Sequence, residues 1–328
     1  MVDQDDTQDP FQLASEPHRT KGRGLRISIS ERLRVARKIP QAVVKVTSFC
    51  HGPRHATRHL DYITRQGDLP LEKDSGEVLL DREEQQAVLA DWVFDSRKRS
   101  RDTANIVFSM PPGADLEALR RSVRKVGLRA FEGHEWVFAV HNDRHHPHAH
   151  MMVAMRGWDS DKKMRLRKAD LFELRKVFAE AAREEGVQLA ATPRYVRGVG
   201  RRALRQDLYF MKKRGVELHV ERDAAREAIQ AVKSKSEDSK PWEDAMNARH
   251  EAEKKLNLEY AQRLRLTAEQ KSEDERKALL RAAESLERLA HTLPTPKTRR
   301  QAWMEHASKK LDSQKEKPAQ KQGQEREV

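Results

Sequence analysis

The sequence has little cysteine and no long apolar run, and each shortage excludes a class of protein. Cys50 is the one cysteine among 328 residues, so the chain has no intrachain disulfide and no cysteine-based zinc site. No run of about 18 apolar residues occurs, so we expect no transmembrane helix and no membrane insertion. The start, MVDQDDTQDP, is acidic and lacks the apolar core of a secretory signal. These absences favour a cytoplasmic protein.

Aromatic residues are also scarce, at 5% of the chain, while charged residues make up 36%. This balance is too polar for one core spread over the whole length, so we expect one compact domain with solvated segments attached. The formal net charge is +13. Such basicity favours a polyanionic partner, nucleic acid first, because paired phosphates release counterions. Basicity alone is also common in proteins that have no such partner.

Composition and periodicity predict three regions: a disordered arm over 1–40, a folded domain over 41–215, and a charged helical extension with a solvated tail over 216–328. The extension has too few large apolar residues for a core of its own. In the folded domain we expect strands at 42–49, 105–110, 135–141 and 148–155, and helices at 54–66, 83–98, 115–131 and 169–185. This order predicts an α+β fold with a central antiparallel sheet and flanking helices.

The stretch HNDRHHPHAH, His141 to His150, has five histidines among its ten residues. Alternate side chains on a strand share a face, so His148 and His150 point the same way. An antiparallel hairpin would bring His141 beside His148. Three imidazoles on one face form a ligand set for a divalent metal with open positions, and a cluster of surface histidines is the alternative. Asp143 can hydrogen-bond a ligand imidazole or accept a proton.

The stretch RHATRHLDYITRQGDLPL predicts a helix with one apolar face. At about 100° per residue that face holds Ala56, Leu60 and Ile63. Tyr62 lies off it, in line with two histidines and flanked by Arg58 and Arg65. A tyrosine on a cationic face is a candidate nucleophile for phosphate chemistry. The alternative is a tyrosine at the domain edge that buries only the body of its ring.

The histidine stretch, as HNDRHHPHAHMMV, resembles the third motif of plasmid relaxases of the MobA and T-DNA border endonuclease type, within the HUH endonucleases. That motif runs H-x-D-x-x-x-P-H-x-H before apolar residues, and this stretch matches every fixed position. HLDYITRQGDLPL resembles the first motif, NIVFSMPPGAD the strand and turn between the two, and ATPRYVRGVGRR the segment that closes the domain. The resemblance covers roughly 41–205. One departure is that the family's tyrosine lies nearer the N-terminus. Residues 1–40 therefore resemble an arm added to the family's domain, or they result from a start codon assigned too early.

The resemblance implies a tyrosine DNA endonuclease that nicks single-stranded DNA at an origin of transfer. Tyr62 would form a 5′-phosphotyrosyl link and release a 3′-hydroxyl, while His141, His148 and His150 hold a divalent metal. Asp143 is the expected proton acceptor. Nitrogen ligands favour manganese, cobalt or zinc by softness, whereas cellular abundance favours magnesium.

We expect five arginines to contact backbone phosphates of the DNA: Arg58, Arg65, Arg194, Arg197 and Arg201. The alternative for each of them is a solvated surface charge. The resemblance further implies conjugative mobilisation of a plasmid or an integrated element, accessory relaxosome proteins, a coupling ATPase and type IV secretion into a recipient cell. Alternative functions are an HUH-type replication initiator or transposase, and a non-catalytic DNA-binding or metal-storage protein. A tyrosine N-terminal to the histidines favours the relaxase, because replication initiators place theirs after them.

Overall fold

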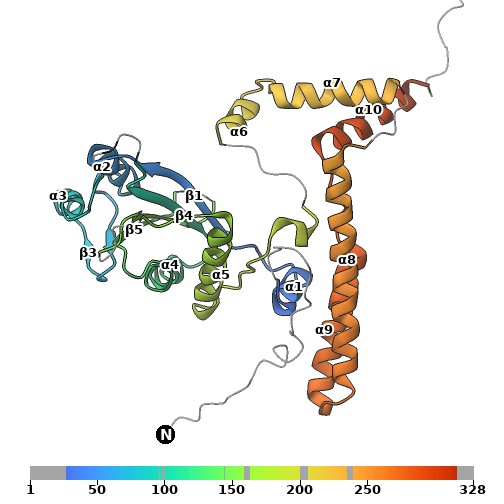
Figure 1. The fold of residues 1–328 in the computed structure, drawn as a ribbon, viewed down its shortest axis with the longest axis horizontal. Coiled ribbons are helices and arrows are strands. Elements are labelled where there is room, and N and C mark those ends of the chain that lie inside the picture. Colours follow the sequence, from blue (N-terminus) through green and yellow to red (C-terminus); the bar gives the residue numbers. More distant parts are fainter. Residues whose placement is uncertain are drawn as a thin grey trace, which may run out of the picture. The chain divides into compact units, whose positions relative to one another are not determined.

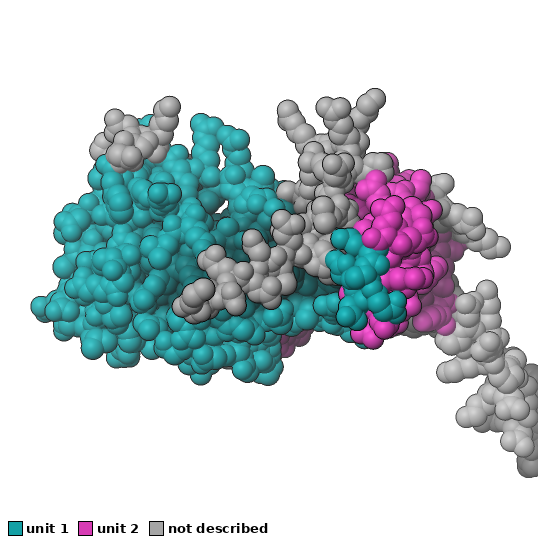
Figure 2. All heavy atoms as spheres, turned by 90° about the horizontal axis from the view of Figure 1, so that it is seen from below, with its two compact units in different colours: residues 1–193, 271–275 teal, residues 194–270, 276–328 magenta. Residues whose placement is uncertain are grey.

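The computed structural model describes residues 27–95, 97, 100–143, 145–158, 163–199, 206–234 and 239–315. The chain divides into two compact units (Figure 2). Unit 1 comprises residues 1–193 and 271–275, and unit 2 comprises residues 194–270 and 276–328. The predicted histidine cluster and Tyr62 both belong to unit 1.

Unit 1 contains one antiparallel sheet with the strand order β1-β4-β6-β5-β2-β3 (Figure 1). Its strands are β1 (Val43–Cys50), β2 (Leu71–Lys73), β3 (Val78–Leu79), β4 (Thr103–Ser109), β5 (Trp136–His141) and β6 (His148–Ala154). The predicted α+β class and the four predicted strands are confirmed. The sequence did not predict β2 and β3, because two or three residues are too few to show a period of two.

The helices of unit 1 cover the two faces of this sheet unequally. They are α1 (Ile29–Ala36), α2 (Pro53–Ile63), α3 (Arg82–Ala87), α4 (Leu116–Ala130) and α5 (Lys168–Glu184). Helices α4 and α5 bury one face in a large core that includes Phe108, Met151 and Phe178. Helix α2 packs on the other face through a smaller core that includes Leu60, Ile63 and Met152, with α3 and a 3₁₀ turn (Val88–Ala90) beside it.

The predicted helix over 83–98 is wrong in its second half. Helix α3 ends at Ala87 and gives way to a 3₁₀ turn and then an irregular segment. Leu89 and Trp92 are buried and Val93 is exposed, and the carboxylate of Asp102 accepts a hydrogen bond from the backbone N–H of Asp95. This tertiary bond competes with helical hydrogen bonding, which the local apolar pattern cannot reveal.

The expectation of a disordered arm over 1–40 also fails where the structure describes the chain. Helix α1 begins after Ser28, whose hydroxyl caps the N–H of Glu31, and it buries Ile29 and Leu33. The Glu31 carboxylate accepts a hydrogen bond from the backbone N–H of Ala191, about 160 residues away in sequence. The high charge of this segment predicted disorder, because its contact with Ala191 cannot be deduced from local sequence. Residues 1–26 lie outside the described ranges.

Helix α2 is built to present its last turn to the sheet. Pro53 occupies the first turn, where its missing N–H costs nothing, and Ala56, Leu60 and Ile63 are buried. The helix ends at Ile63 instead of residue 66, because Arg65 and Gln66 adopt left-handed backbone angles, with φ of 54° and 61°. The apolar stripe of the predicted helix is therefore confirmed, and its end is corrected.

The remaining elements are helical, as expected after residue 215. They are a 3₁₀ turn (Arg194–Arg197), α6 (Gln206–Lys213), α7 (His219–Lys233), α8 (Pro241–Ala268), α9 (Glu273–Thr292) and α10 (Arg299–Lys315). Helix α8 begins at Pro241. Helices α8 and α9 are joined by an ion pair between Arg265 and Glu287 and bury Leu264 and Leu286, so this region packs more apolar surface than its composition predicted. In the described ranges, every helix is too short or too polar to span a membrane.

Substitution of Gly127 tests the packing that supports β5. Gly127 lies in α4, and a Cβ added there would approach the Trp136 ring to 2.4 Å. We expect Gly127→Ala to lower the free energy of unfolding by roughly 1–3 kcal/mol, because overpacking outweighs the better helix propensity of alanine. The midpoint of urea unfolding measures this. Leu128→Ala, at a 58% exposed position on the same helix, is the control and should change little. An unchanged midpoint for Gly127→Ala would refute the packing.

Candidate active site

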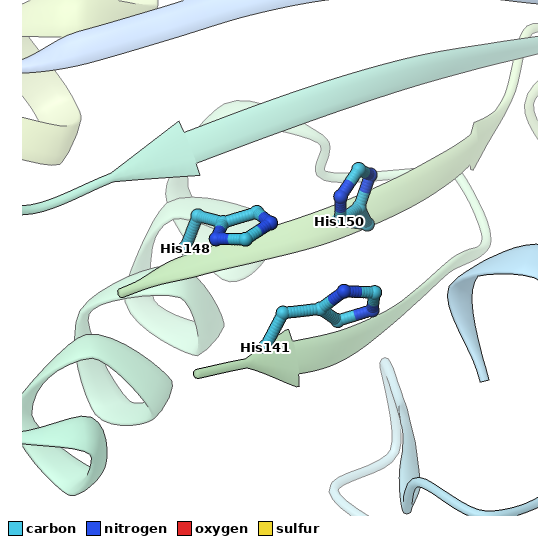
Figure 3. A group of neighbouring side chains, drawn as sticks. All are labelled: His141, His148 and His150. Carbon is cyan, nitrogen blue, oxygen red and sulfur yellow. The ribbon is translucent and has the colours of Figure 1, made fainter. Parts of the chain in front are cut away.

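Three histidines from two neighbouring strands converge on the face of the sheet that carries α2 (Figure 3). His141 on β5 lies directly opposite His148 on β6, and His150 follows on the same face of β6. One ligand nitrogen from each of the three lies within 4.8 Å of the others. The hairpin expected from the sequence is therefore present, and it brings together all three predicted metal ligands.

Backbone carbonyls orient two of these imidazoles. The Nε2 atom of His141 donates to the carbonyl oxygen of Ile63 at 2.6 Å, and Nδ1 of His148 donates to that of His146 at 3.1 Å. A carbonyl can only accept, so each of these nitrogens carries the proton and the opposite ring nitrogen keeps its lone pair. Carbonyls that fix the tautomer of histidines in this way are a common feature of metal sites.

Burial favours the form of the histidines that binds metal. His141 and His148 are 1% and 6% exposed, and His150 is half-buried. Desolvation lowers the pKa of His141, and the hydrogen bond to Ile63 only partly opposes this shift. A metal ligand must be the neutral imidazole, so a lowered pKa keeps the site ready to bind over a wider pH range. The donor set fits one divalent ion with positions left open for other ligands.

Tyr62 lies beside this cluster. Its side chain is 46% exposed, and its ring meets the His150 ring edge-on at a centroid distance of 5.7 Å. The neighbouring residues Leu60 and Ile63 are buried under the helix, as the stripe predicted. The three other tyrosines, Tyr195, Tyr209 and Tyr260, all belong to unit 2. In unit 1, the tyrosine expected to be the nucleophile is thus next to the expected metal ligands.

Arg65 connects Tyr62 to the histidine hairpin. Its guanidinium lies 5.6 Å from the centroid of the Tyr62 ring, pairs with the carboxylate of Asp143, and approaches Nδ1 of His141 to 3.4 Å. Partial burial would raise the pKa of Asp143, but the positive charge of Arg65 beside it, with smaller contributions from the nearby histidines, outweighs this effect and lowers that pKa. Asp143 is consequently a stable carboxylate that holds Arg65 at the site.

His59 is a neighbour of Tyr62 to which the sequence analysis gave no role. Its ring lies 5.8 Å from the Tyr62 ring, one helical turn earlier. Burial, together with the charge of His55, lowers the pKa of His59 to about 4, so this imidazole is neutral near pH 7. The position of His59 three residues before Tyr62 was the available signal, because residues three apart on a helix are neighbours.

The predicted DNA-binding arginines fall into separate places. Arg65 lies at the site, and Arg58 is exposed on α2, four residues before Tyr62. Arg194 and Arg197 lie in the 3₁₀ turn of unit 2. Arg201 lies outside the described residues. Within unit 1 the structure therefore brings Arg65 alone among the five into contact with the candidate catalytic residues.

The histidine cluster predicts measurable metal binding. We expect Mn²⁺ or Co²⁺ to raise the melting temperature of the protein, since an ion at 100 times its Kd stabilises by about 2.7 kcal/mol. His148→Ala should abolish most of this rise by removing one of three ligands. His145→Ala, an exposed neighbour in the same loop, should retain it. An equal rise in all three proteins would show that the ions bind elsewhere.

Comparison with known proteins agrees with this geometry. Residues 62–187 match the family model described as relaxase, MobA/VirD2-like, nuclease domain. The matched segment begins at Tyr62 and includes Asp143 and the three histidines.

The chain is also similar to the T-DNA border endonuclease VirD2 of Rhizobium radiobacter, with 27% identity over 168 residues. This similarity covers 44% of the chain and 39% of the relative, so the chain spans about two fifths of that protein's length. Residues 62–187 of the chain are therefore similar to the nuclease domain of the MobA/VirD2-like relaxases.

Proposed function

We propose that the protein nicks one DNA strand at an origin of transfer through a 5′-phosphotyrosyl intermediate, as a step in conjugative mobilisation. The observation that carries this proposal is the contact between Tyr62 and His150, which puts a partly exposed phenol beside the candidate metal ligands. A nucleophile next to a group that fixes the phosphate is the arrangement needed for in-line displacement. The name of the similar border endonuclease supports a DNA substrate.

In the proposed step, the phenolic oxygen of Tyr62 attacks the scissile phosphorus. A bond forms between this oxygen and phosphorus, and the bond from phosphorus to the 3′ oxygen of the preceding nucleotide breaks. The phenol loses its proton, and the leaving 3′ oxygen gains one. Because one phosphodiester replaces another, the reverse reaction can rejoin the strand when a 3′-hydroxyl attacks the link.

His141, His148 and His150 would hold the divalent ion in this reaction, and their carbonyl partners keep two of them correctly oriented. A bound ion supplies charge that polarises a non-bridging phosphate oxygen. Three nitrogen donors favour manganese, cobalt or zinc over magnesium by softness, and abundance favours magnesium in the cell. We propose manganese or magnesium as the working ion.

Two neighbours of Tyr62 would assist the loss of its proton. Arg65 lies over the ring, where its positive charge would stabilise the negative oxygen that attacks the phosphate. The lowered pKa of Asp143 makes it a weaker base, so its support for the reaction runs chiefly through its ion pair with Arg65. The neutral imidazole of His59 is a second candidate acceptor of the proton, and its lowered pKa makes it a weaker base in the same way.

Transfer between cells would need functions outside this site. We propose that accessory proteins and a coupling ATPase recognise the protein with its linked DNA, and that the helices after residue 215 provide the handle for export. The content of lysine and arginine in this extension would also add nonspecific affinity for DNA.

Replacing Tyr62 tests the proposed nucleophile. We expect Tyr62→Phe to lose formation of the covalent protein–DNA adduct while retaining affinity for single-stranded DNA, because the attacking oxygen alone is removed. The assay incubates the protein and Mn²⁺ with a labelled oligonucleotide library of random sequence and detects adducts on a denaturing gel. Sequencing of the linked DNA then reports the preferred site.

Tyr209→Phe is the matched control for this experiment. Tyr209 is a similarly exposed tyrosine, at 53%, but it belongs to unit 2. Its substitution should leave the adduct unchanged. An adduct formed by Tyr62→Phe would assign the nucleophile to another residue, and the absence of any wild-type adduct would favour a non-catalytic DNA-binding protein.

A further inference from the structure

Part of the sheet face that carries the histidines is not covered by the residues that the structure describes. Helix α2 covers the β5 and β6 side, where Val137, Ala139 and Met152 are buried against it. On the β1 and β4 side, six residues lie at the surface and are exposed or half-buried. We call these residues the open strip: Val43, Lys45, Thr47 and Ser48 on β1, and Val107 and Ser109 on β4.

The open strip is continuous with the histidine cluster through the register of the sheet. Lys45 pairs with Val107, which pairs with His150, so these three residues form one row across the sheet. Val43, Ser109 and His148 form the adjacent row. With strands about 4.8 Å apart, the backbone of Lys45 lies roughly 10 Å from that of His150, on the same face.

A β-bulge fixes the polar end of the strip. The register shifts between Val46 and Ser48, which leaves Thr47 as the extra residue. The Thr47 hydroxyl donates to the carbonyl oxygen of Asn105 at 3.1 Å, and the Asn105 amide donates to the Ser48 hydroxyl at 2.8 Å. Bulges commonly re-aim side chains next to active sites. Two adjacent hydroxyl side chains of an edge strand are thereby exposed and held in place.

Lys45 differs from cations on the opposite side of the sheet. On α4, Arg121 and Lys125 pair with Glu185, and Arg124 pairs with the buried Glu72. Lys45 is exposed and forms no ion pair within the part of the chain that the structure describes. An uncompensated ammonium group in the row of His150 therefore remains available for an anion.

We propose that the open strip is a platform for the single-stranded DNA that flanks the scissile phosphate, with the Lys45 ammonium on a neighbouring phosphate. The inference rests on the proposed function, because a strand whose phosphate is held at the histidines must leave the site over an adjoining surface. The exposed hydroxyls suit sugar and phosphate contacts, and Val43 and Val107 suit apolar contact with sugars or bases. The ammonium at the edge gives affinity that does not depend on sequence.

The test measures the binding of fluorescein-labelled oligothymidylate by the full chain at several salt concentrations. We expect Lys45→Ala to weaken binding roughly tenfold, as loss of one charged contact does. The slope of log K against log salt should fall in magnitude by about 0.7, the value for one phosphate on a single strand. Lys45→Arg should restore most of both quantities, and melting temperatures check that each variant is folded.

Lys168→Ala is the matched control. Lys168 is an exposed lysine in the first turn of α5, which packs on the other face of the sheet, so it removes equal charge from a different surface. Equal losses in Lys45→Ala and Lys168→Ala would overturn the platform and indicate a general charge effect. Unchanged affinity with aggregation of Lys45→Ala would also overturn it, and would assign Lys45 to protection of the sheet edge.

The adduct assay separates this inference from the proposed function. Loss of affinity in Lys45→Ala, with a normal wild-type adduct, supports both. A normal adduct with unchanged affinity and salt slope in Lys45→Ala overturns the platform alone. Failure of the wild type to form any adduct overturns the proposed function, while the comparison of Lys45→Ala with Lys168→Ala still decides whether DNA lies on the strip.

Discussion

The hydrogen bond from His141 to the carbonyl oxygen of Ile63 joins the two halves of the site. Ile63 is the last residue of α2, and the carbonyl groups at the end of a helix have no partner within it. One interaction therefore satisfies the helix end, orients a candidate metal ligand, and sets the distance between Tyr62 and the histidines. Burial of His141 strengthens this coupling, because a buried carbonyl or imidazole left without its partner is costly.

The left-handed residues after α2 complete this arrangement. A β-carbon disfavours positive φ, yet Arg65 and Gln66 both adopt it before Gly67, which has the same hand. These positive φ angles reverse the direction of the chain directly after α2. The side chain of Arg65 therefore points toward the hairpin loop, where its guanidinium pairs with Asp143. Backbone strain of this kind persists where the surroundings compensate for it, often at functional sites.

The faces on which strand and helix residues lie could be predicted from the sequence, because local periodicity encodes them. The alternation around His148 and His150 placed both on one face, and the apolar stripe of α2 placed Tyr62 outside the core, as the structure has them. Long-range partners could not be deduced in this way. The pairing of Arg65 with Asp143 and the packing of α1 through Glu31 depend on how separate elements meet.

The two faces of the sheet differ in their roles: one contributes most of the stability, and the other carries the candidate active site. One face buries large side chains such as Phe108, Phe138 and Phe178 under two helices, and it carries most of the core of unit 1. The described residues cover the other face only in part, and His148 and His150 on β6 lie next to its uncovered part. A histidine at such a boundary has a dry side that fixes its tautomer and an open side that a phosphate can reach. A fully covered face would exclude the DNA strand, and a fully open one would leave the imidazoles hydrated and free to turn. The position of the histidines between these extremes therefore follows from the placement of α2.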